Sequence, residues 1–393
     1  MSKTPKLRFK EFSGDWESNK LSNYTEKITR KNKDFLVTNV ISNSARNGLV
    51  SQRDFFDKDI ANQNNIDGYY IIENGDFVYN PRKSLESPYG PINRYNIEDA
   101  GVVSPLYLCF KINEKVNGKF LEYYFKSSKW YRFIYQNSDQ GARHDRVSIK
   151  DSEFFKLNTK FPSLEEQEKV ASFFSLIDEK ISLQGEKVEA LKDYKRGIMQ
   201  KIFSRELRFK DDEGRNYPEW EEKKLGEIAD CLDNKRKPLN SNERADMQGN
   251  IPYYGANGVV DFVNDYIFDE NIILLAEDGG NFDYFATKPI AQLVKGKSWV
   301  NNHAHVLKAK YCTEFLFYSL VHKDIRKYIN GTSRAKLNKS DMLDIVVNIP
   351  KSLEEQKKIA DILGAIYLKI EKEQEKLDSL NEYKKGLLQQ MFV

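Results

Sequence analysis

Cysteines and long apolar runs are scarce in this sequence, and each scarcity excludes a class of protein. The 393 residues include three cysteines, Cys109, Cys231 and Cys312, which lie far apart and form neither a CxxC pair nor an even disulfide framework. This usage fits a reducing cytoplasm. No segment approaches the roughly 18 apolar residues of a membrane span, and the polar N-terminus lacks the apolar core of a signal peptide. We therefore expect a soluble cytoplasmic protein with no membrane partner.

A strong charge of either sign is also missing. The formal net charge is only +3, so a surface for nucleic acid would have to be local. The hydrophobic fraction of 40% and the aromatic fraction of 13% favour folded domains. A chain of this length exceeds one ordinary core and predicts about two to four units.

Motifs for catalysis are absent as well. The GKS sequence at Gly296 lacks the upstream glycine of a P-loop, and no glycine-rich loop opens a Rossmann helix. An amino-methyltransferase would need Asn, Asp or Ser followed by two prolines and an aromatic residue. The closest segments, NPRK at Asn80 and SPYG at Ser87, lack the second proline. We predict that the chain has no catalytic residues and no cofactor of its own.

Histidines are few, and one pair invites a metal hypothesis. His303 and His305 would share a face of a strand, where Cys312 could complete a site. We favour packing or polar contacts for these side chains and predict no metal.

What the sequence does contain is a long charged helix pattern that occurs twice. Leu164 matches Leu353 and Phe203 matches Phe392 without a gap. Ser163 and Ser352, each followed three residues later by a glutamate, predict N-caps with capping boxes. At ~1.5 Å per residue, a helix of about forty residues is roughly 60 Å long.

Each copy carries an apolar stripe at steps of three and four residues, the spacing at which two helices bury a shared face. We predict that the two helices pair as an antiparallel coiled coil and that polar Gln184 and Glu373 meet and fix its register. In the alternative, each stripe packs on its own globular domain. The stripe residues are Val170, Phe174, Ile177, Ile181, Val188, Leu191 and Ile198 in the first copy, and Ile359, Leu363, Ile366, Ile370, Leu377, Leu380 and Leu387 in the second.

A second repeat opens each half. Trp16 and Leu21 correspond to Trp220 and Leu225, and the segments that follow show strand-like runs punctuated by Gly, Asn and Pro, with some helix. These patterns predict an α+β fold with two mixed globular domains in a pseudo-twofold tandem repeat, separated by the two long helices. The predicted boundaries are an opening module with the first domain at 1–161, a central helix at 162–204, the repeated module with the second domain at 205–349, and a C-terminal helix at 350–393.

Basic, amide and aromatic residues gather in both globular domains. The domains also end alike, because the glycine, the basic residue and the aspartate of GARHDRVSIKD at Gly141 and GTSRAKLNKSD at Gly331 stay in step. Such side chains bind phosphates, and Arg and Asn also read base edges. Any one of them could be plain solvated surface, but the recurrence favours DNA contact. The candidates are Asn80, Arg82, Lys83, Arg143, His144 and Arg146 in the first domain, and Lys235, Arg236, Tyr253, Tyr254, Asn257, Lys297, Asn301, Asn302, Ser333, Arg334, Lys336 and Asn338 in the second.

With these repeats the sequence resembles the specificity subunits of type I restriction-modification systems. The likeness spans essentially the whole chain, and the one departure is Ser22 where the second half has Gly226. It rests on the duplicated openings (Leu7–Leu21 and Leu207–Gly226), the duplicated SLEEQ segments (Pro162–Ala171 and Pro350–Ala360) and the duplicated YK-G-Q-F endings (Tyr194–Phe203 and Tyr383–Phe392).

The resemblance implies a circularly arranged molecule without catalysis of its own. Two target-recognition domains, about Ser22–Phe161 and Glu227–Ile349, would each read half of a bipartite, asymmetric site in double-stranded DNA, and the helices would act as spacer and docking surface. Two modification subunits would carry S-adenosylmethionine and methylate adenine. Two restriction subunits would use ATP and Mg to translocate and cleave DNA, in bacterial defence. The alternatives are a specificity chain for a fused nuclease-methyltransferase and a two-domain scaffold that binds proteins.

Overall fold

The computed structural model describes residues 3–52, 66–139, 145–331 and 335–393. Its contacts divide the chain into two units. Unit 1 comprises Met1–Gly185 and Glu375–Val393, and unit 2 comprises Glu186–Gln374. Unit 1 therefore contains both ends of the chain, and each unit contains parts of both long helices. Within the described residues, no helix is both long and apolar enough to cross a membrane.

The core of unit 1 is a four-stranded antiparallel sheet with the order β2-β9-β6-β7. Three two-stranded ladders, β1-β10, β3-β4 and β5-β8, complete its strands. The strands are β1 (Glu17–Lys20), β2 (Thr25–Lys27), β3 (Ile41–Ser44), β4 (Gly48–Ser51), β5 (Tyr70–Ile72), β6 (Phe77–Tyr79), β7 (Ile92–Arg94), β8 (Gly101–Val103), β9 (Leu108–Ile112) and β10 (Asn158–Phe161). The short helices are η1 (Leu21–Asn23), α2 (Gly118–Lys126), α3 (Tyr131–Asn137) and α4 (Asp151–Phe154).

Unit 2 contains a sheet with the same topology. Its order, β12-β19-β16-β17, reproduces that of unit 1 strand for strand, and its ladder β11-β22 corresponds to β1-β10. A second sheet, β14-β13-β18-β15, is specific to this unit among the described residues, and it includes a parallel pair, β13 with β18. The two domains therefore share one framework although their sequences differ.

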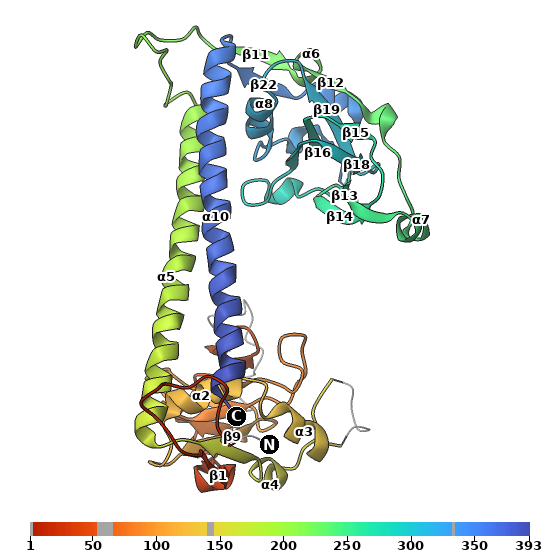
Figure 1. Ribbon diagram of the computed structural model, residues 1–393. Coiled ribbons are helices and arrows are strands. Elements are labelled where there is room, and N and C mark those ends of the chain that lie inside the picture. The colour runs from red at the N-terminus through yellow and green to blue at the C-terminus, as the bar shows by residue number, and fades with distance from the viewer. Residues whose placement is uncertain (1–2, 53–65, 140–144, 332–334) are drawn as a thin grey trace. The chain divides into compact units, whose positions relative to one another are not determined.

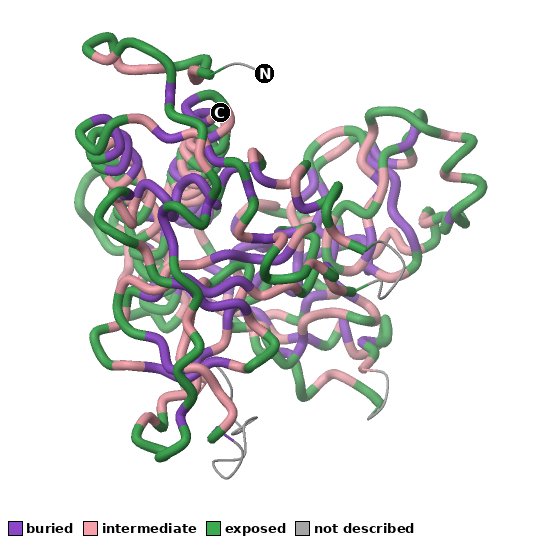
Figure 2. Tube along the Cα trace, turned by 90° about the horizontal axis from the view of Figure 1, so that it is seen from below, coloured by how far each residue is buried: buried purple, intermediate pink, exposed green. Residues whose placement is uncertain are grey.

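The strands of unit 2 are β11 (Glu221–Lys224), β12 (Ala229–Cys231), β13 (Gln248–Gly255), β14 (Gly258–Val263), β15 (Phe268–Asp269), β16 (Ile272–Ala276), β17 (Ala291–Val294), β18 (Lys297–Val300), β19 (Ala304–Ala309), β20 (Ile329–Asn330), β21 (Lys336–Leu337) and β22 (Val346–Ile349). Its short helices are α6 (Leu225–Ile228), η3 (Asp233–Lys235), α7 (Ser241–Asp246), η4 (Phe282–Tyr284), α8 (Thr313–Leu320), η5 (Arg326–Tyr328) and α9 (Lys339–Leu343). The central strands of both core sheets are buried, whereas the connecting loops are mostly exposed (Figure 2).

Two long helices, α5 (Leu164–Phe203) and α10 (Leu353–Met391), follow the β10 and β22 strands (Figure 1). Ser163 Oγ accepts from the Glu166 N–H at 3.4 Å, and Ser352 Oγ accepts from the Glu355 N–H at 3.3 Å, so the predicted N-caps are confirmed. The predicted capping boxes stay a prediction, and the two glutamate side chains each bind an arginine of the opening module.

That arginine contact is the same in both units. Arg8 donates to both carboxylate oxygens of Glu166 at 2.8 and 2.7 Å, and Arg208 donates to those of Glu355 at 3.2 and 3.3 Å. Two parallel N–H···O bonds of this kind fix the guanidinium as well as attract it. Each opening module is thereby attached to the first turn of the long helix that begins in its own unit.

The two helices run antiparallel in each unit. In unit 1 the rings of Phe174 and Phe392 stack with centroids 6.1 Å apart, and further along α5 Asp178 forms an ion pair with Lys384. In unit 2 Lys187 pairs with Glu373 at 3.0 Å, and the Lys195 ammonium lies 4.1 Å from the ring centroid of Tyr367. Residue numbers rise along α5 as they fall along α10 in both units. The predicted antiparallel pairing is confirmed, whereas the contact of Gln184 with Glu373 stays a prediction.

The predicted stripes are the inner faces of these helices, since all fourteen of their residues are buried or half-buried. Packing on the globular domains occurs as well, as the alternative held. Val170, Phe174 and Leu387 belong to the aromatic core of unit 1, and Ile359 and Leu363 belong to the core of unit 2. The ends of the helices therefore pack on a domain and on each other at once. For this reason each compact unit contains parts of both helices, and the predicted boundaries at 161, 204 and 349 stay predictions.

Two leucines of α10 test the role of the stripe. Leu363 is 0% exposed and Leu368 is 59% exposed. We expect Leu363→Ala to lower the free energy of unfolding by about 2–5 kcal/mol, because it leaves a cavity in the core of unit 2. Leu368→Ala should change it by less than about 0.5 kcal/mol. Urea denaturation measures both, and equal losses in the two variants would contradict the assignment of the buried face.

Candidate nucleic-acid interface

Two basic segments that lie far apart in the sequence of unit 1 come together in the structure. Arg82, after strand β6, forms an antiparallel bridge with Arg146 in the exit loop of the domain. The Lys83 N–H donates to the Asp145 carbonyl at 2.9 Å, and the Val147 N–H donates to the Pro81 carbonyl at 2.8 Å. The loop after β6 and the exit loop therefore form one surface.

This surface of unit 1 is cationic. Arg82 and Lys83 are exposed, and within the described residues neither side chain forms an ion pair. Arg146 is half-buried beside a cavity of about 340 Å³, which it lines together with Tyr70, Tyr107 and other side chains. Exposed cations without internal partners are suited to phosphate oxygens.

Asn80 has a different place, behind that surface. Its Nδ2 donates to the Asn43 carbonyl at 3.0 Å, and its Oδ1 accepts from the Arg82 N–H at 3.1 Å. Buried Asn43 in turn donates to the Val78 carbonyl at 2.7 Å. Asn80 thus shapes the loop that presents Arg82.

The corresponding loop of unit 2 is acidic. Asp278, after strand β16, forms the antiparallel bridge with Lys336 of the exit loop, and the Leu337 N–H donates to the Glu277 carbonyl at 2.7 Å. The backbone arrangement is that of unit 1, but Asp278 stands at the place of Arg82, while Lys336 keeps the positive charge of Arg146. The shared framework therefore presents two cations at the bridge in unit 1 and an acid beside a cation in unit 2.

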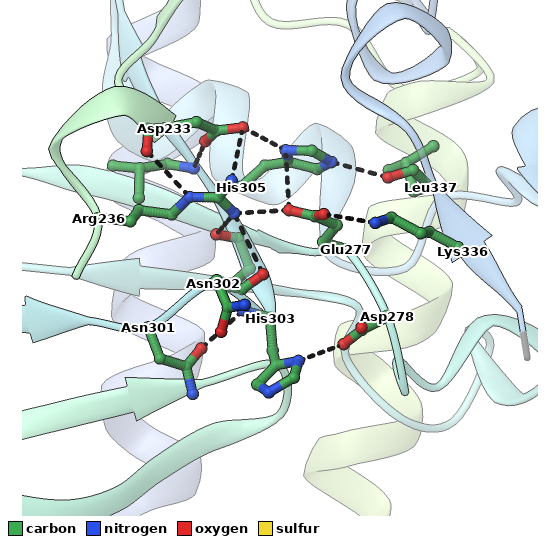
Figure 3. A network of polar contacts seen from close by, with 12 residues as sticks. Asp233, Arg236, Glu277, Asp278, Asn301, Asn302, His303, His305, Lys336 and Leu337 are labelled. Atoms are coloured by element: carbon green, nitrogen blue, oxygen red, sulfur yellow. Dashed lines mark hydrogen bonds and ion pairs between the residues drawn. The ribbon is translucent and has the colours of Figure 1, made fainter. Parts of the chain in front are cut away.

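A network of buried charges lies under this loop (Figure 3). His305 Nδ1 lies 2.6 Å from Asp233 Oδ2, and His305 Nε2 lies 2.9 Å from the Leu337 carbonyl oxygen. Both ring nitrogens of His305 therefore contact an oxygen atom, one from a carboxylate and one from the backbone. The network joins η3, β19 and β21, and so it connects the exit strand to the core sheet.

Arg236 and Lys336 complete the network on its other side (Figure 3). Arg236 Nη1 donates to Glu277 Oε2 at 2.6 Å, and its Nη2 lies 3.3 Å from Asp233. Lys336 Nζ lies 3.1 Å from Glu277 Oε1. Burial raises the pKa of Asp233, but hydrogen bonds from His305 and the Val306 N–H outweigh it and leave that pKa below its usual value. The pKa of Glu277 is likewise lowered, since Arg236 and Lys336 outweigh its burial.

Asp233, Glu277 and His305 lie close enough together to share a metal ion, but their surroundings do not fit one. Arg236 already supplies positive charge to both carboxylates, Lys336 adds more at Glu277, and both nitrogens of His305 are occupied by contacts with oxygen atoms. A metal ligand needs a free lone pair. The metal site suggested by the sequence, with His303, His305 and Cys312, does not fit either. His303 Nδ1 instead lies 2.5 Å from Asp278 Oδ1, and Cys312 precedes α8. The interpretation of the two histidines as polar-contact residues is confirmed.

An open hollow of about 610 Å³ lies next to the network. The turn between β13 and β14 lines it with Asn257, Val259 and Val260, and the loops lining the other side contribute Asp278, Asn301 and His303. Asn257 Nδ2 donates to the Gly279 carbonyl at 2.8 Å, and Asn301 Oδ1 accepts from the His303 N–H at 2.8 Å. Among the described residues the lining contains amide, imidazole and carboxylate groups and no lysine or arginine, and such groups are suited to base edges.

Sequence reasoning named Asn257 and Asn301 in this hollow but missed Asp278 and His303. The strand-like run at 272–276 was visible, and the two acids after it, Glu277 and Asp278, were the available signal. Acids alone do not indicate DNA contact, so the pattern offered no reason to select them.

Other candidate residues of unit 2 are spread over its surface. Lys235 and Asn302 are exposed, and the Lys297 ammonium lies 4.6 Å from the ring centroid of Tyr266. Asn338 precedes α9 and donates to Asp341 at 3.1 Å. Arg143, His144, Ser333 and Arg334 lie outside the described residues.

Three candidates point inward and need correction. Tyr253 is 1% exposed, and its hydroxyl accepts from the Leu239 N–H at 3.0 Å. Tyr254 is half-buried and packs on an apolar cluster, and Arg236 is occupied by the network. These side chains are engaged within the domain, so this conformation does not offer them to DNA. Basic or aromatic identity alone could not reveal such engagement.

Arg236 and its neighbour Lys235 allow a buried structural cation to be compared with an exposed one. Arg236→Ala removes the guanidinium that joins Asp233 to Glu277, and we expect it to lower the free energy of unfolding by about 3–5 kcal/mol, since both carboxylates lose a partner. Lys235→Ala, one residue away and exposed, should change it by less than about 0.5 kcal/mol. Urea denaturation at neutral pH measures both.

The Arg236→Ala variant should also differ from the parent protein in how its stability depends on pH. The lowered pKa values of Asp233 and Glu277 mean that their contribution to stability is complete above the ordinary carboxyl range of about pH 4 and is lost as the pH falls through the folded values. Arg236→Ala should therefore lose less stability on acidification than the parent protein. An unchanged acid dependence would show that Arg236 does not hold these carboxylates ionised.

Comparisons with known proteins point in one direction. A family model described as the type I restriction modification DNA specificity domain matches residues 217–382. The chain is 38% identical over 151 residues to a putative type I restriction enzyme specificity subunit of Haemophilus influenzae. This match covers 38% of this chain and 37% of that protein. The chain is also 30% identical over 212 residues to the type I restriction enzyme MjaVIII specificity subunit of Methanocaldococcus jannaschii. This match covers 50% of this chain and 47% of that protein. The chain thus matches less than half the length of these two relatives.

Solved structures share the fold over nearly the full length. The S subunit of a type I restriction-modification system from M. genitalium superposes with a TM-score of 0.60 at 19% identity and covers 99% of both chains. A chain from a type I R-M system studied for complex assembly and conformational transition gives a TM-score of 0.57 at 13% identity, with 95% of this chain and 96% of that chain covered. At these identities the likeness concerns the fold alone.

Proposed function

We propose that this chain is the non-catalytic DNA-recognition subunit of a type I restriction-modification enzyme, because a model of the type I DNA specificity domain matches residues 217–382 and the chain is similar to specificity subunits over part of its length. The supporting observation is the paired loop surface that both domains build on the same core sheet, at Arg82 and Arg146 in unit 1 and at Asp278 and Lys336 in unit 2. The affinity should fall steeply with salt, since phosphate contacts release counterions.

Each domain reads one half of a bipartite, asymmetric site in double-stranded DNA. The asymmetry follows from the side chains on the shared framework. Unit 1 offers free cations to phosphates at Arg82 and Lys83, whereas unit 2 offers the exposed amide of Asn257 and the half-buried imidazole of His303 to base edges. Two surfaces of such different chemistry recognise different sequences.

The long helices dock two modification subunits. Their outer faces carry large apolar residues that recur at equivalent positions of the repeat. Tyr194 and Tyr383 are 57% and 58% exposed, and Leu164 and Leu353 are 44% and 45% exposed. A surface that occurs twice suits two copies of one partner. S-adenosylmethionine belongs to these subunits, and ATP and Mg belong to two restriction subunits of the complete enzyme.

Removing the free cations of unit 1 tests the DNA surface. We expect Arg82→Ala combined with Lys83→Ala to weaken binding to all sequences alike and to reduce the slope of log affinity against log salt by about 2, or about 0.9 per lost phosphate contact. Fluorescence anisotropy with duplex DNA, with the modification subunit present, measures both quantities.

Lys180→Ala is the control, because Lys180 is an exposed lysine on α5 in the same unit. It should leave the slope unchanged. If the double variant binds like the parent, the paired loops of unit 1 are not the phosphate-binding surface. If the parent itself shows no sequence preference with or without the modification subunit, the chain is a protein-binding scaffold.

Changing the helix length tests their use as a spacer. One additional heptad in the middle of both α5 and α10 preserves the stripe and lengthens each helix by about 10 Å, which corresponds to roughly 3 base pairs of DNA. We expect the unread gap of the recognised site to grow by about that amount, while the two half-sites stay the same. Sequencing of methylated adenines in cells that carry the variant and its modification subunit reads the gap directly.

A four-residue insertion at the same two places is the matched control, since it breaks the heptad register. It should abolish methylation by disturbing the paired helices. A heptad variant that methylates sites with the original gap would refute the spacer role.

A further inference from the structure

Unit 2 contains a cavity of about 420 Å³ that DNA recognition does not use. It lies among α5, α8, β22 and the loop after η4. Met199 and Phe203 of α5, Phe285 of the loop and Tyr318 of α8 form apolar walls. Pockets of ~300–1,000 Å³ with largely apolar walls are the size class that holds small organic ligands.

Unit 1 provides an internal comparison, because α2 and α8 occupy corresponding places. The Asn117 N–H donates to Gln167 Oε1 at 2.8 Å, and the Cys312 N–H approaches Gln356 Oε1 at 3.4 Å, in the first turns of the matching helices α5 and α10. The rings agree as well. Phe120 contacts Trp16 and Phe392, and Phe315 contacts Trp220 and Phe203, at centroid distances of 5.2–6.1 Å in all four pairs.

This correspondence places Tyr124 of unit 1 at the position of Ser319 in unit 2, four residues after the matching phenylalanines. Tyr124 is buried, and its ring centroid lies 5.4 Å from that of Phe161 and 6.1 Å from that of Phe392. Ser319 lines the cavity, and its hydroxyl donates to the Leu316 carbonyl of its own helix at 2.8 Å. The space that a tyrosine ring fills in unit 1 is therefore open in unit 2.

Two cations, Arg196 and Lys323, line the cavity, and no aspartate or glutamate is among the described residues of its lining. His322 lines it as well, but burial lowers the pKa of its imidazole. Arg196 pairs with Asp193 on its own helix, but Lys323 forms no ion pair within the described part of the chain. Burial lowers the pKa of Lys323, so its charge is unfavourable there without an anion. A carboxylate in the cavity would offset this cost.

We propose that this cavity binds a free aromatic carboxylate of metabolite size. The ring lies between Met199, Phe203 and Phe285, and the carboxylate pairs with Lys323 and Arg196. A side chain of a partner subunit is the less favoured occupant, because two identical partners would find this cavity only in unit 2, where Tyr124 has no counterpart. The inference does not depend on DNA recognition, so failure of either proposal leaves the other intact.

Isothermal titration of the full chain with indole-3-acetate and 4-phenylbutyrate tests the site. We expect saturable one-to-one binding of at least one of them. Tryptamine, which has the indole ring but a cationic tail, should bind at least about tenfold more weakly than indole-3-acetate, because it meets the lysine with the wrong charge. Lys323→Met should weaken carboxylate binding by about tenfold or more.

Ser319→Tyr is the filling variant, and it introduces the residue that unit 1 carries at this place. It should abolish carboxylate binding and leave DNA affinity unchanged. Should this variant fail to fold, nuclear Overhauser contacts between the bound probe and the Met199 methyl group of the parent locate the site independently. Absence of binding by both carboxylates, equal affinity for tryptamine, unchanged binding after Ser319→Tyr, or no contact with Met199 would each overturn the proposal.

Discussion

The burial of one apolar helix stripe against its own repeated copy is the constraint on which this structure depends. Each helix buries its stripe against the other helix, and near the ends also against a domain core, as Phe174 does in unit 1 and Leu363 does in unit 2. The antiparallel pairing brings the end of α10 to the start of α5 in unit 1 and the start of α10 to the end of α5 in unit 2. In both units the opening module also bonds to the last turns of a long helix. In unit 1 the Leu7 N–H donates to the Gln390 carbonyl of α10 at 3.0 Å. In unit 2 the Leu207 N–H donates to the Lys201 carbonyl of α5, which directly precedes it in the chain, at 2.9 Å.

The same framework carries different chemistry in the two domains. Both core sheets have one strand order, and both exit loops bridge to the loop after the third strand of that order. The side chains at that bridge are two cations, Arg82 and Arg146, in unit 1, and an acid with a cation, Asp278 and Lys336, in unit 2. A repeat that conserves backbone hydrogen bonds while its loop residues change supports two independent binding specificities, because loop side chains contribute little to the core.

Unit 2 also separates charges that support the fold from charges that are available to a ligand. Arg236 and His305 connect Asp233 and Glu277 beneath the loop surface, and the low dielectric of the interior makes each of these contacts depend on the others. Asn257, Asn301 and His303 lie beside that network and line an open hollow. The buried ions keep the loop in place, so that the polar groups above it need not reorganise when a ligand binds.

The sequence by itself determined the features that repeat at short range. The helix stripes, the serine N-caps and the duplicated modules depend on spacings of three to seven residues, and these spacings are visible in the letters. Tertiary structure decided the rest. Glu166 and Glu355 bind arginines 158 and 147 residues away, Arg236 and Tyr253 turn inward, and one cavity exists because Ser319 stands where the other domain has Tyr124. These outcomes depend on which distant side chain completes a contact, and the pattern of one segment carries no information about its partner in another.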